Sequence, residues 1–314
     1  MPKVSMVVVV YNSRPFLQPV FEAIFKQTFS DLEVFAVINA STDGSKEFLA
    51  QSFPQVKIID PQKNTGFAGG NNLAIKQSSA QFIQLVNPDL IMTPNYIETM
   101  LDAFNDPQVA AATGKLLRYD FKTNTSSDVI DSTGIVMSLS GRARDRGQLE
   151  TDYQQYDNQR AVFGVTGAAP MYRKSALDNV AYKGEYFDES FLAYWEDVDL
   201  SWRLNNAGFK NVYVPEAVAY HGRNAGQSKG GYLHLLNFVK HHQTLPTHIC
   251  RLNYKNHILM YLKNTKRIHP LFILRELAML CYVLVFETST LGVIPEIFRQ
   301  LPANRQKRLA QNLK

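Results

Sequence analysis

Apolar and polar residues alternate in blocks along the first 90 positions, and each block has the length of one strand or one helix. The run of mostly apolar and β-branched residues at 4–10 predicts a strand that is covered on both faces of a sheet. Apolar residues then recur at helical spacing over residues 15–27. Further blocks predict strands at 33–38, 56–60 and 82–86, with helices at 43–52 and 68–78. This alternation predicts an α/β fold with a doubly wound, mostly parallel sheet.

The pattern changes after residue 114. Residues 114–159 are rich in Thr, Ser, Gly and Arg, which predicts hairpins and loops rather than another strand–helix unit. Regularity returns at residues 162–172, followed by a predicted helix at 196–206 that ends at Gly208 and a closing strand at 211–214. Glycine and small polar residues cluster at 226–231. We therefore expect one domain at residues 1–228 and a C-terminal helical appendage at residues 229–314.

The C-terminal region is basic, because residues 217–275 contain no Asp or Glu. Its apolar run at residues 277–286 is far shorter than the roughly 20 residues of a membrane-spanning helix. Amphipathic helices with a basic face predict association with an anionic membrane surface, and a homodimer interface is the alternative. We expect no nucleic-acid binding, since nothing in the first domain supports it.

Composition agrees with a folded protein of 314 residues, 45% of them apolar and 19% charged, with a net charge of +5. Cys250 and Cys281 are the only cysteines, so a disulfide scaffold and a zinc–cysteine cluster are excluded. Both thiols are expected in the core. The first residues do not have the pattern of a secretory signal, so we expect a cytoplasmic protein on the inner face of the cell membrane.

Four small polar loops follow the predicted strands, at residues 11–13, 39–45, 64–72 and 87–89. Ligands of doubly wound sheets bind beyond the carboxyl ends of the strands, where these loops lie. In the last loop, Asp89 can ligate a divalent cation that holds a diphosphate. A turn with a helix-capping acid is the alternative, and turn chemistry alone favours it.

The two middle loops also allow two interpretations. Amides, hydroxyls and the Asp43 carboxylate at 39–45 can contact a base and ribose, or they can cap the next helix. The glycine-rich loop at 64–72 can bring backbone N–H groups close to phosphate. It lacks the Gly-x-Gly-x-x-Gly pattern, so a dinucleotide-binding fold is disfavoured.

Two further positions carry candidate chemistry. Glu196, Asp197 and Asp199 lie at a predicted helix start, where the helix dipole stabilises negative charge without any functional need. A carboxylate at a cleft could equally be a general base. His221 ends an apolar stretch, where a lone histidine is more often structural, although imidazole is a common metal ligand.

The motifs occur along the chain in the order seen in family 2 glycosyltransferases of the GT-A fold, and residues 4–228 resemble that family. The resemblance rests on Asn64-x-Gly66-Phe67-x-x-Gly70-x-Asn72, Asn87-Pro88-Asp89, Glu196-Asp197-x-Asp199 and residues 215–221. The first two motifs most resemble those of bacterial rhamnosyltransferases. Two departures occur: Ile38 stands where many relatives carry Asp, and Asn87 replaces the first Asp of Asp-x-Asp, as is common in the rhamnosyltransferase-like group.

The resemblance implies a role for each matching position. Asp89 and His221 would hold Mg²⁺ or Mn²⁺, and Asp197 would be the catalytic base with Glu196 beside it. The donor nucleotide would contact Tyr11, Asn12, Asn39, Ser41, Asp43, Asn64, Gly66, Phe67, Asn72, Asn87 and Asp89. The sugar or acceptor would contact Gly167, Ala168, Trp195 and Arg203.

The implied activity is metal-assisted, inverting transfer of L-rhamnose from dTDP-rhamnose to a glycan, carried by a polyprenyl-diphosphate lipid or part of the cell envelope. One alternative is a transferase for another nucleotide sugar, such as a UDP-hexose or UDP-galactofuranose. A non-catalytic nucleotide-sugar-binding scaffold is the other, although it has no reason to keep Asp89, Asp197 and His221 together. A nucleotidyltransferase is disfavoured, because Arg14 is the only phosphate-binding candidate in the first loop.

Overall fold

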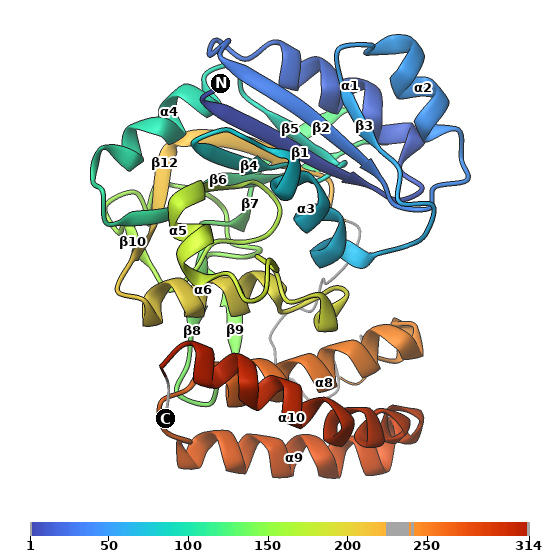
Figure 1. Ribbon diagram of the computed structural model, residues 1–314, viewed down its shortest axis with the longest axis vertical. Coiled ribbons are helices and arrows are strands. Elements are labelled where there is room, and N and C mark those ends of the chain that lie inside the picture. The colour runs from blue at the N-terminus through green and yellow to red at the C-terminus, as the bar shows by residue number, and fades with distance from the viewer. Residues whose placement is uncertain (1, 224–238, 240–241, 313–314) are drawn as a thin grey trace.

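The structure is a computed structural model that describes residues 2–223, 239 and 242–312. Its N-terminal half alternates strands and helices, as the apolar pattern predicts (Figure 1). The strands are β1 (Val4–Val10), β2 (Leu32–Ile38), β3 (Lys57–Ile59) and β4 (Phe82–Leu85). The helices are α1 (Arg14–Phe25), α2 (Ser45–Ser52) and α3 (Gly66–Gln77). The strands lie in the order β4-β1-β2-β3, and each neighbouring pair is parallel.

Strand β1 is apolar except for Ser5 because helices cover both faces of the sheet. Met6 and Val8 belong to the core that contains the buried residues of α1, whereas Val7 belongs to the core that contains those of α3. Both faces of the strand are largely removed from water, and its one polar residue, Ser5, is buried with its hydroxyl 2.5 Å from that of Ser78. The prediction of a doubly wound sheet is confirmed.

The other half of the sheet is mixed. Antiparallel β11 (Pro170–Arg173) lies between β4 and β6 (Val109–Asp120), and β12 (Lys210–His221) runs parallel to β6. The remaining strands are β5 (Leu90–Met92), β7 (Thr125–Ser132), β10 (Ala161–Val162), β8 (Ile135–Met137) and β9 (Ala143–Asp145). Three helices complete this half: α4 (Tyr96–Asp102), α5 (Lys174–Val180) and α6 (Glu196–Asn206).

Two strands of this half differ from the prediction. Strand β6 begins at Val109, where no strand was predicted, whereas its second part pairs with β7 as one of the hairpins expected within residues 114–159. Its first part is rich in Ala and Gly, which have weak strand preference, and only its burial among neighbouring strands makes it a strand. The closing strand predicted at 211–214 is longer and extends to His221. The β6–β7 and β8–β9 pairs are hairpins, and helix 196–206 is confirmed.

The described C-terminal residues form α8 (Thr247–Asn264), α9 (Pro270–Phe286) and α10 (Ile294–Ala310). These helices make a separate layer on the α6 side of the sheet domain (Figure 1). Leu259 and Met260 of α8 share a core with Val198 of α6, so the layer is packed against the helix that carries the predicted base. The domain boundary expected at 226–231 lies outside the described residues.

Two further observations concern these helices. Cys250 is buried as expected, but the prediction for Cys281 is wrong, because this thiol is exposed on α9. Among the described residues, no single helix is both long and apolar enough to cross a membrane. Helix α9 and the segment Thr288–Ala310 satisfy length and composition together, and they meet at a bend of 120°.

Candidate active site

Three segments that carry predicted site residues meet at one edge of the sheet. Strands β4 and β11 are antiparallel neighbours, so the end of β4 lies beside the start of β11. Accordingly, the Asn87 N–H donates to the Ala168 carbonyl at 2.8 Å. The neighbouring Gly167 N–H donates to Oδ2 of Asp197 at 2.9 Å. Segment 167–168 thus joins the 87–89 turn to the start of α6.

Asp89 and His221 are brought together by strand pairing. Asp89 precedes β5, and in the antiparallel β5–β12 pair His221 is opposite Leu90. His221 Nε2 lies 3.3 Å from Oδ1 of Asp89 and 3.3 Å from Nδ2 of Asn87. The predicted metal ligands are therefore adjacent, although they are 132 positions apart in the sequence.

The other nitrogen of His221 is held by a residue that the sequence analysis missed. Nδ1 lies 2.8 Å from Oδ2 of Asp131, whose side chain is 1% exposed and also pairs with Arg118 and Arg223. A carboxylate on Nδ1 fixes the tautomer that leaves Nε2 free for a metal. No sequence motif pointed to Asp131, because it lies in residues 114–159, where only hairpins and loops were predicted.

This arrangement fits a divalent cation. Asp89 supplies a carboxylate oxygen and His221 an imidazole nitrogen, on the same side and 3.3 Å apart. Burial alone would lower the pKa of His221, but its bonds to Asp131 and Asp89 outweigh burial and raise the pKa to about 9. A cation would take the place of the proton on Nε2, so its binding would release a proton.

Asp197 has the environment of a general base. Its oxygens accept from the backbone N–H groups of Gly167 and Val198, at 2.9 and 2.8 Å. Burial raises its pKa to about 6, against the lowering effect of these bonds, and the charge of Asp145 raises it further. Burial, together with the charge of Asp197, also raises the pKa of Glu196. The upward shift is the larger at Glu196, so Asp197 loses its proton at the lower pH and is the better candidate for the base.

A cavity of about 180 Å³ opens beside Asp197. Its walls include Thr166 before β11, Trp195 at the start of α6 and Arg144 of β9. Asn253 of α8 also lines the cavity, and its side chain accepts a hydrogen bond from Nε1 of Trp195 at 3.1 Å. A small hydroxyl-bearing group could enter here and meet the carboxylate that would take its proton.

Two predicted nucleotide loops are held together by their own polar groups. The Asn12 N–H donates to Oγ of Ser41 at 3.1 Å, and Asn12 Oδ1 accepts from the Thr42 N–H at 2.9 Å. Asp43 accepts from the Arg14 N–H at 2.8 Å and from the Ser45 hydroxyl at 2.6 Å. The N-cap of α2 is Gly44 and has no side-chain cap bond, so Asp43 ties the two helix starts together without being the N-cap, and nucleotide contact stays a prediction. Exposed Tyr11 lies at the end of β1.

Asn39 connects the second and third loops from a buried position. Its Oδ1 accepts from the Thr65 N–H at 2.7 Å, and its Nδ2 donates to Oδ1 of Asn64 at 3.0 Å. These bonds use both ends of the Asn39 amide. Its side chain holds the loops in register, and its predicted contact with a base stays a prediction.

The glycine-rich loop is also packed against Gly167 and against Leu192 in the segment before α6. Gly66 has a φ of +71°, and a Cβ there would lie 2.3 Å from the Leu192 carbonyl oxygen. Phe67 packs on Gly167, where a Cβ would be 3.3 Å from its ring. Asn72 is buried, accepts from the Phe187 N–H at 2.9 Å and donates to the Phe187 carbonyl at 2.8 Å. This loop therefore positions the surroundings of Asp197.

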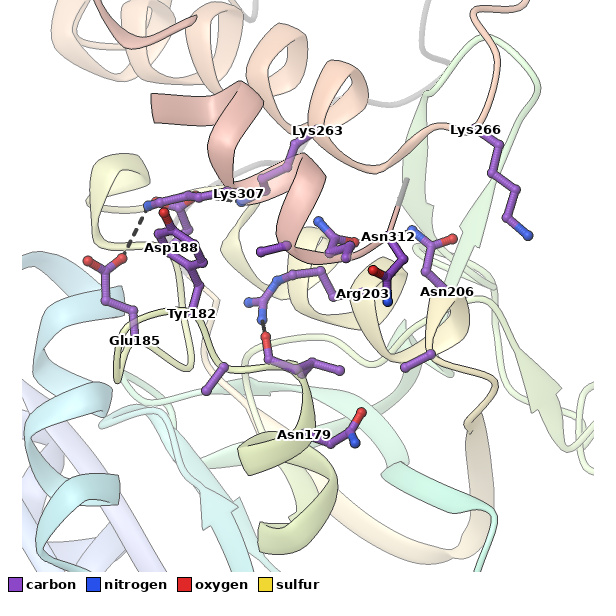
Figure 2. Close-up of a pocket in the computed structure, with 15 residues that line it drawn as sticks. Asn179, Tyr182, Glu185, Asp188, Arg203, Asn206, Lys263, Lys266, Lys307 and Asn312 are labelled. Carbon is purple, nitrogen blue, oxygen red and sulfur yellow. Dashed lines mark hydrogen bonds and ion pairs between the residues drawn. The ribbon is translucent and has the colours of Figure 1, made fainter. Parts of the chain in front are cut away.

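Arg203 lies away from the Asp197 cavity. Its Nε donates to Oδ2 of Asp199 at 3.0 Å, and its other nitrogens donate to the carbonyls of Val180 and Tyr186. Figure 2 shows it in a different pocket, between α6 and the C-terminal helices. These bonds support a structural role, and its predicted contact with an acceptor stays a prediction.

Buried ion pairs fasten the C-terminal helices at this second pocket. Lys263 of α8 lies 2.5 Å from Oδ2 of Asp188 and 2.8 Å from Oδ1 of Asp199, and all three side chains are at most 3% exposed. Lys307 of α10 reaches Asp188 and Glu185, and Figure 2 shows both lysines converging on Asp188. The C-terminal layer is thereby tied to the helix that begins with Glu196 and Asp197.

Helix α8 also stabilises the strained backbone of residues 192–195, which precede Asp197 in the sequence. Leu192, Tyr194 and Trp195 all have positive φ, between 63° and 74°, which is costly for residues with side chains. Nδ2 of Asn256 lies 2.9 Å from each of the carbonyl oxygens of Phe191, Ala193 and Tyr194. A single amide of α8 therefore supports the backbone that places Asp197.

Comparison with known proteins identifies the family. The sequence profile of glycosyl transferase family 2 matches residues 5–180, more than half of the chain. The chain is also similar to the N-acetylglucosaminyl-diphospho-decaprenol L-rhamnosyltransferase of Mycobacterium tuberculosis. Identity is 28% over 256 residues, which cover 76% of this chain and 81% of the relative.

Solved structures share the fold at low identity. GalNAc-T7 with UDP, GalNAc and Mn²⁺ has a TM-score of 0.60 at 12% identity, over 84% of this chain and 48% of that one, so this chain matches about half of its length. The mannosyltransferase PcManGT of Pyrobaculum calidifontis, with GDP-Man and Mn²⁺, has a TM-score of 0.54 at 14% identity, covering 99% and 84%. The expected GT-A fold is thus confirmed. Sequence and fold agree, and the chain belongs to glycosyl transferase family 2.

Proposed function

We propose that this glycosyltransferase transfers L-rhamnose from dTDP-rhamnose to a hydroxyl of a lipid-linked or cell-envelope glycan, with inversion at the anomeric carbon. The observation that carries the proposal is the pair of hydrogen bonds that links the Asn87-Pro88-Asp89 turn, from the Asn87 N–H through segment 167–168, to Asp197. It puts a candidate leaving-group site next to a candidate base. The rhamnosyltransferase relative, whose name gives a diphospho-decaprenol acceptor, supports the choice of sugar and lipid.

In the proposed reaction, Asp197 accepts the proton of an acceptor hydroxyl in the neighbouring cavity while this oxygen attacks the anomeric carbon. The bond from the anomeric carbon to the diphosphate breaks in the same step. A Mg²⁺ or Mn²⁺ ion held by Asp89 and His221 would neutralise the charge that develops on the diphosphate. The backbone N–H groups of Gly167 and Val198 hold the Asp197 carboxylate toward the cavity. The raised pKa of Glu196, caused by its burial and by the charge of Asp197, disfavours a second negative charge there.

Asp131→Asn should weaken Mn²⁺ binding about 10- to 100-fold, because it removes the carboxylate that orients His221. The measurement is the Mn²⁺ concentration that gives half of the maximal donor-induced rise in melting temperature. Asp120→Asn, an exposed substitution at the end of β6, is the matched control and should leave this concentration unchanged. Equal Mn²⁺ requirements for Asp131→Asn and the wild type would contradict the assigned role of Asp131.

We further propose the domain division at residues 1–228 and 229–314, with the protein in the cytoplasm and its C-terminal helices on the inner face of the membrane. The exposed apolar residues of α9 support a membrane-facing role for this layer. In the homodimer alternative, the same residues would be buried against a second copy. Flotation with anionic vesicles, compared with the mass of the protein in free solution, distinguishes these two arrangements.

The test of the donor assignment is a panel of nucleotide sugars in a thermal-shift assay, with and without Mn²⁺. We expect dTDP-rhamnose with Mn²⁺ to raise the melting temperature more than UDP-glucose, UDP-galactofuranose or GDP-mannose, since bound ligand stabilises the folded state. A larger rise with another sugar would reassign the donor. Binding of dTDP-rhamnose without transfer to any glycan-lipid acceptor would instead favour the non-catalytic scaffold.

A further inference from the structure

A groove of about 790 Å³ separates α9 from the β8–β9 hairpin. Val136 and Met137 of the hairpin form one wall, and Leu274, Ala278 and Met279 of α9 form the other. A mostly apolar groove of this volume, with a few polar groups, is typical of a site for a small or elongated ligand.

The apolar surface of the groove continues over the outer side of α9. Leu274, Leu277 and Val285 are 63%, 56% and 68% exposed. A surface helix of a globular protein normally turns polar residues outward, and a contiguous apolar patch marks an interaction surface. The groove therefore opens onto a surface that suits hydrocarbon better than water.

Arginines make the groove suitable for an anion as well. Arg142, Arg144 and Arg275 contribute to its lining. The Arg144 side chain is exposed and has no hydrogen bond or ion pair within the described part of the chain, whereas the adjacent Asp145 pairs with Arg223 at 2.8 Å. The Arg144 guanidinium is thus available to a ligand.

Arg144 also connects the groove to the catalytic site. It lines both the apolar groove and the cavity beside Asp197. The β8–β9 hairpin separates the two spaces, with Ile135 and Ala143 facing the cavity and Val136 and Arg142 facing the groove. A molecule that occupied both spaces would pass this one arginine.

We propose that the groove binds the isoprenoid chain of the acceptor lipid and that Arg144 binds its diphosphate, which places the attached sugar in the cavity beside Asp197. This inference rests on the proposed function. The parts of a long-chain isoprenoid diphosphate that carries a sugar match this surface in sequence. The hydrocarbon chain would lie along α9, the two phosphates would contact the Arg144 guanidinium, and the sugar would lie beside Asp197. Arginine pairs well with phosphate oxygens through its planar donors.

The test measures binding of geranylgeranyl diphosphate, without sugar, to the full-length protein by isothermal titration calorimetry. Ala278→Trp fills the groove and should weaken binding at least 10-fold. Leu277→Trp adds the same side chain one position along α9, outside the groove, and should change binding less than about 2-fold. Arg144→Glu should weaken binding of the diphosphate about 10-fold while changing binding of geranylgeraniol less than about 2-fold.

The outcomes separate this inference from the proposed function. Equal affinities of Ala278→Trp and the wild type, equal losses in Ala278→Trp and Leu277→Trp, or equal affinities of the wild type for geranylgeraniol and its diphosphate would each overturn the groove assignment. The dTDP-rhamnose thermal shift should be the same in Ala278→Trp as in the wild type. No shift in either protein would overturn the donor assignment and leave the lipid-binding result to stand by itself.

Discussion

Asp197→Asn should lower the rate of sugar transfer about 10³-fold while the protein still binds its nucleotide-sugar donor. A positioned general base contributes roughly 10²- to 10⁴-fold to rate, and an amide cannot accept the proton. The change keeps the size of the side chain, so an amide oxygen can still accept a hydrogen bond from Gly167 or Val198. The measurements are kcat for transfer and the donor-induced thermal shift.

Glu196→Gln provides the contrast, because an amide resembles the protonated carboxyl that burial favours at Glu196. Its loss of kcat should stay under about 10-fold, since it removes no base. Full activity in Asp197→Asn, or a larger loss in Glu196→Gln, would remove Asp197 from the role of base.

The pH profile gives a second readout for Asp197. Burial raises its pKa to about 6, and only the ionised form can act as a base. In the wild type, kcat/KM should therefore be low at pH 5, rise through about pH 6 and level off above it. A limb centred near pH 4, the ordinary range of a carboxyl, would show that Asp197 is not buried during catalysis.

Lys263→Met should lower the free energy of unfolding by about 3 kcal/mol or more. Removing one partner of a buried ion pair leaves an uncompensated charge in the interior, which typically costs about 3–5 kcal/mol. Lys263 lies between Asp188 and Asp199, and these groups are almost fully buried. The measurement is a urea unfolding curve at pH 7.

Lys210→Met is the matched control for this prediction. Lys210 pairs with Asp106 at 3.0 Å, but these side chains are 53% and 43% exposed. Exposed pairs contribute less than about 1 kcal/mol, so this variant should unfold close to the wild-type midpoint. Equal midpoints for both variants would show that the Lys263 pairs add nothing to stability.

The C-terminal helices hold the segment that precedes α6 and the proposed base, in addition to forming a surface. Asn256 bonds three carbonyls of the segment before α6, Asn253 orients Trp195, and Lys263 neutralises acids at both ends of this region. The backbone with positive φ at Tyr194 and Trp195 is stable only in such surroundings. Damage to α8 should therefore reduce activity even where no substrate touches the helix.

Local pattern by itself determined the first half of the fold and the start of the site. The apolar block at β1 and the helical spacing of α1 and α6 follow from burial on one or two faces, which each segment records in its own residues. The motif at Asn87-Pro88-Asp89 and the acids at Glu196 and Asp197 could be found because each is a short contiguous signal. The family resemblance then supplied the chemistry that turn and cap statistics alone would have missed.

Only the tertiary structure decided the rest. Asp131 becomes the partner of His221 because β7 and β12 both pair with β6, a contact between residues 90 positions apart that no local pattern records. Strand β6 itself was missed, since its Ala and Gly residues favour a strand only between neighbours. Arg144 likewise gains its place between groove and cavity only when α9 packs near the β8–β9 hairpin. Such contacts join residues that are far apart in the sequence and form only when the whole core packs. No local pattern along the chain records them.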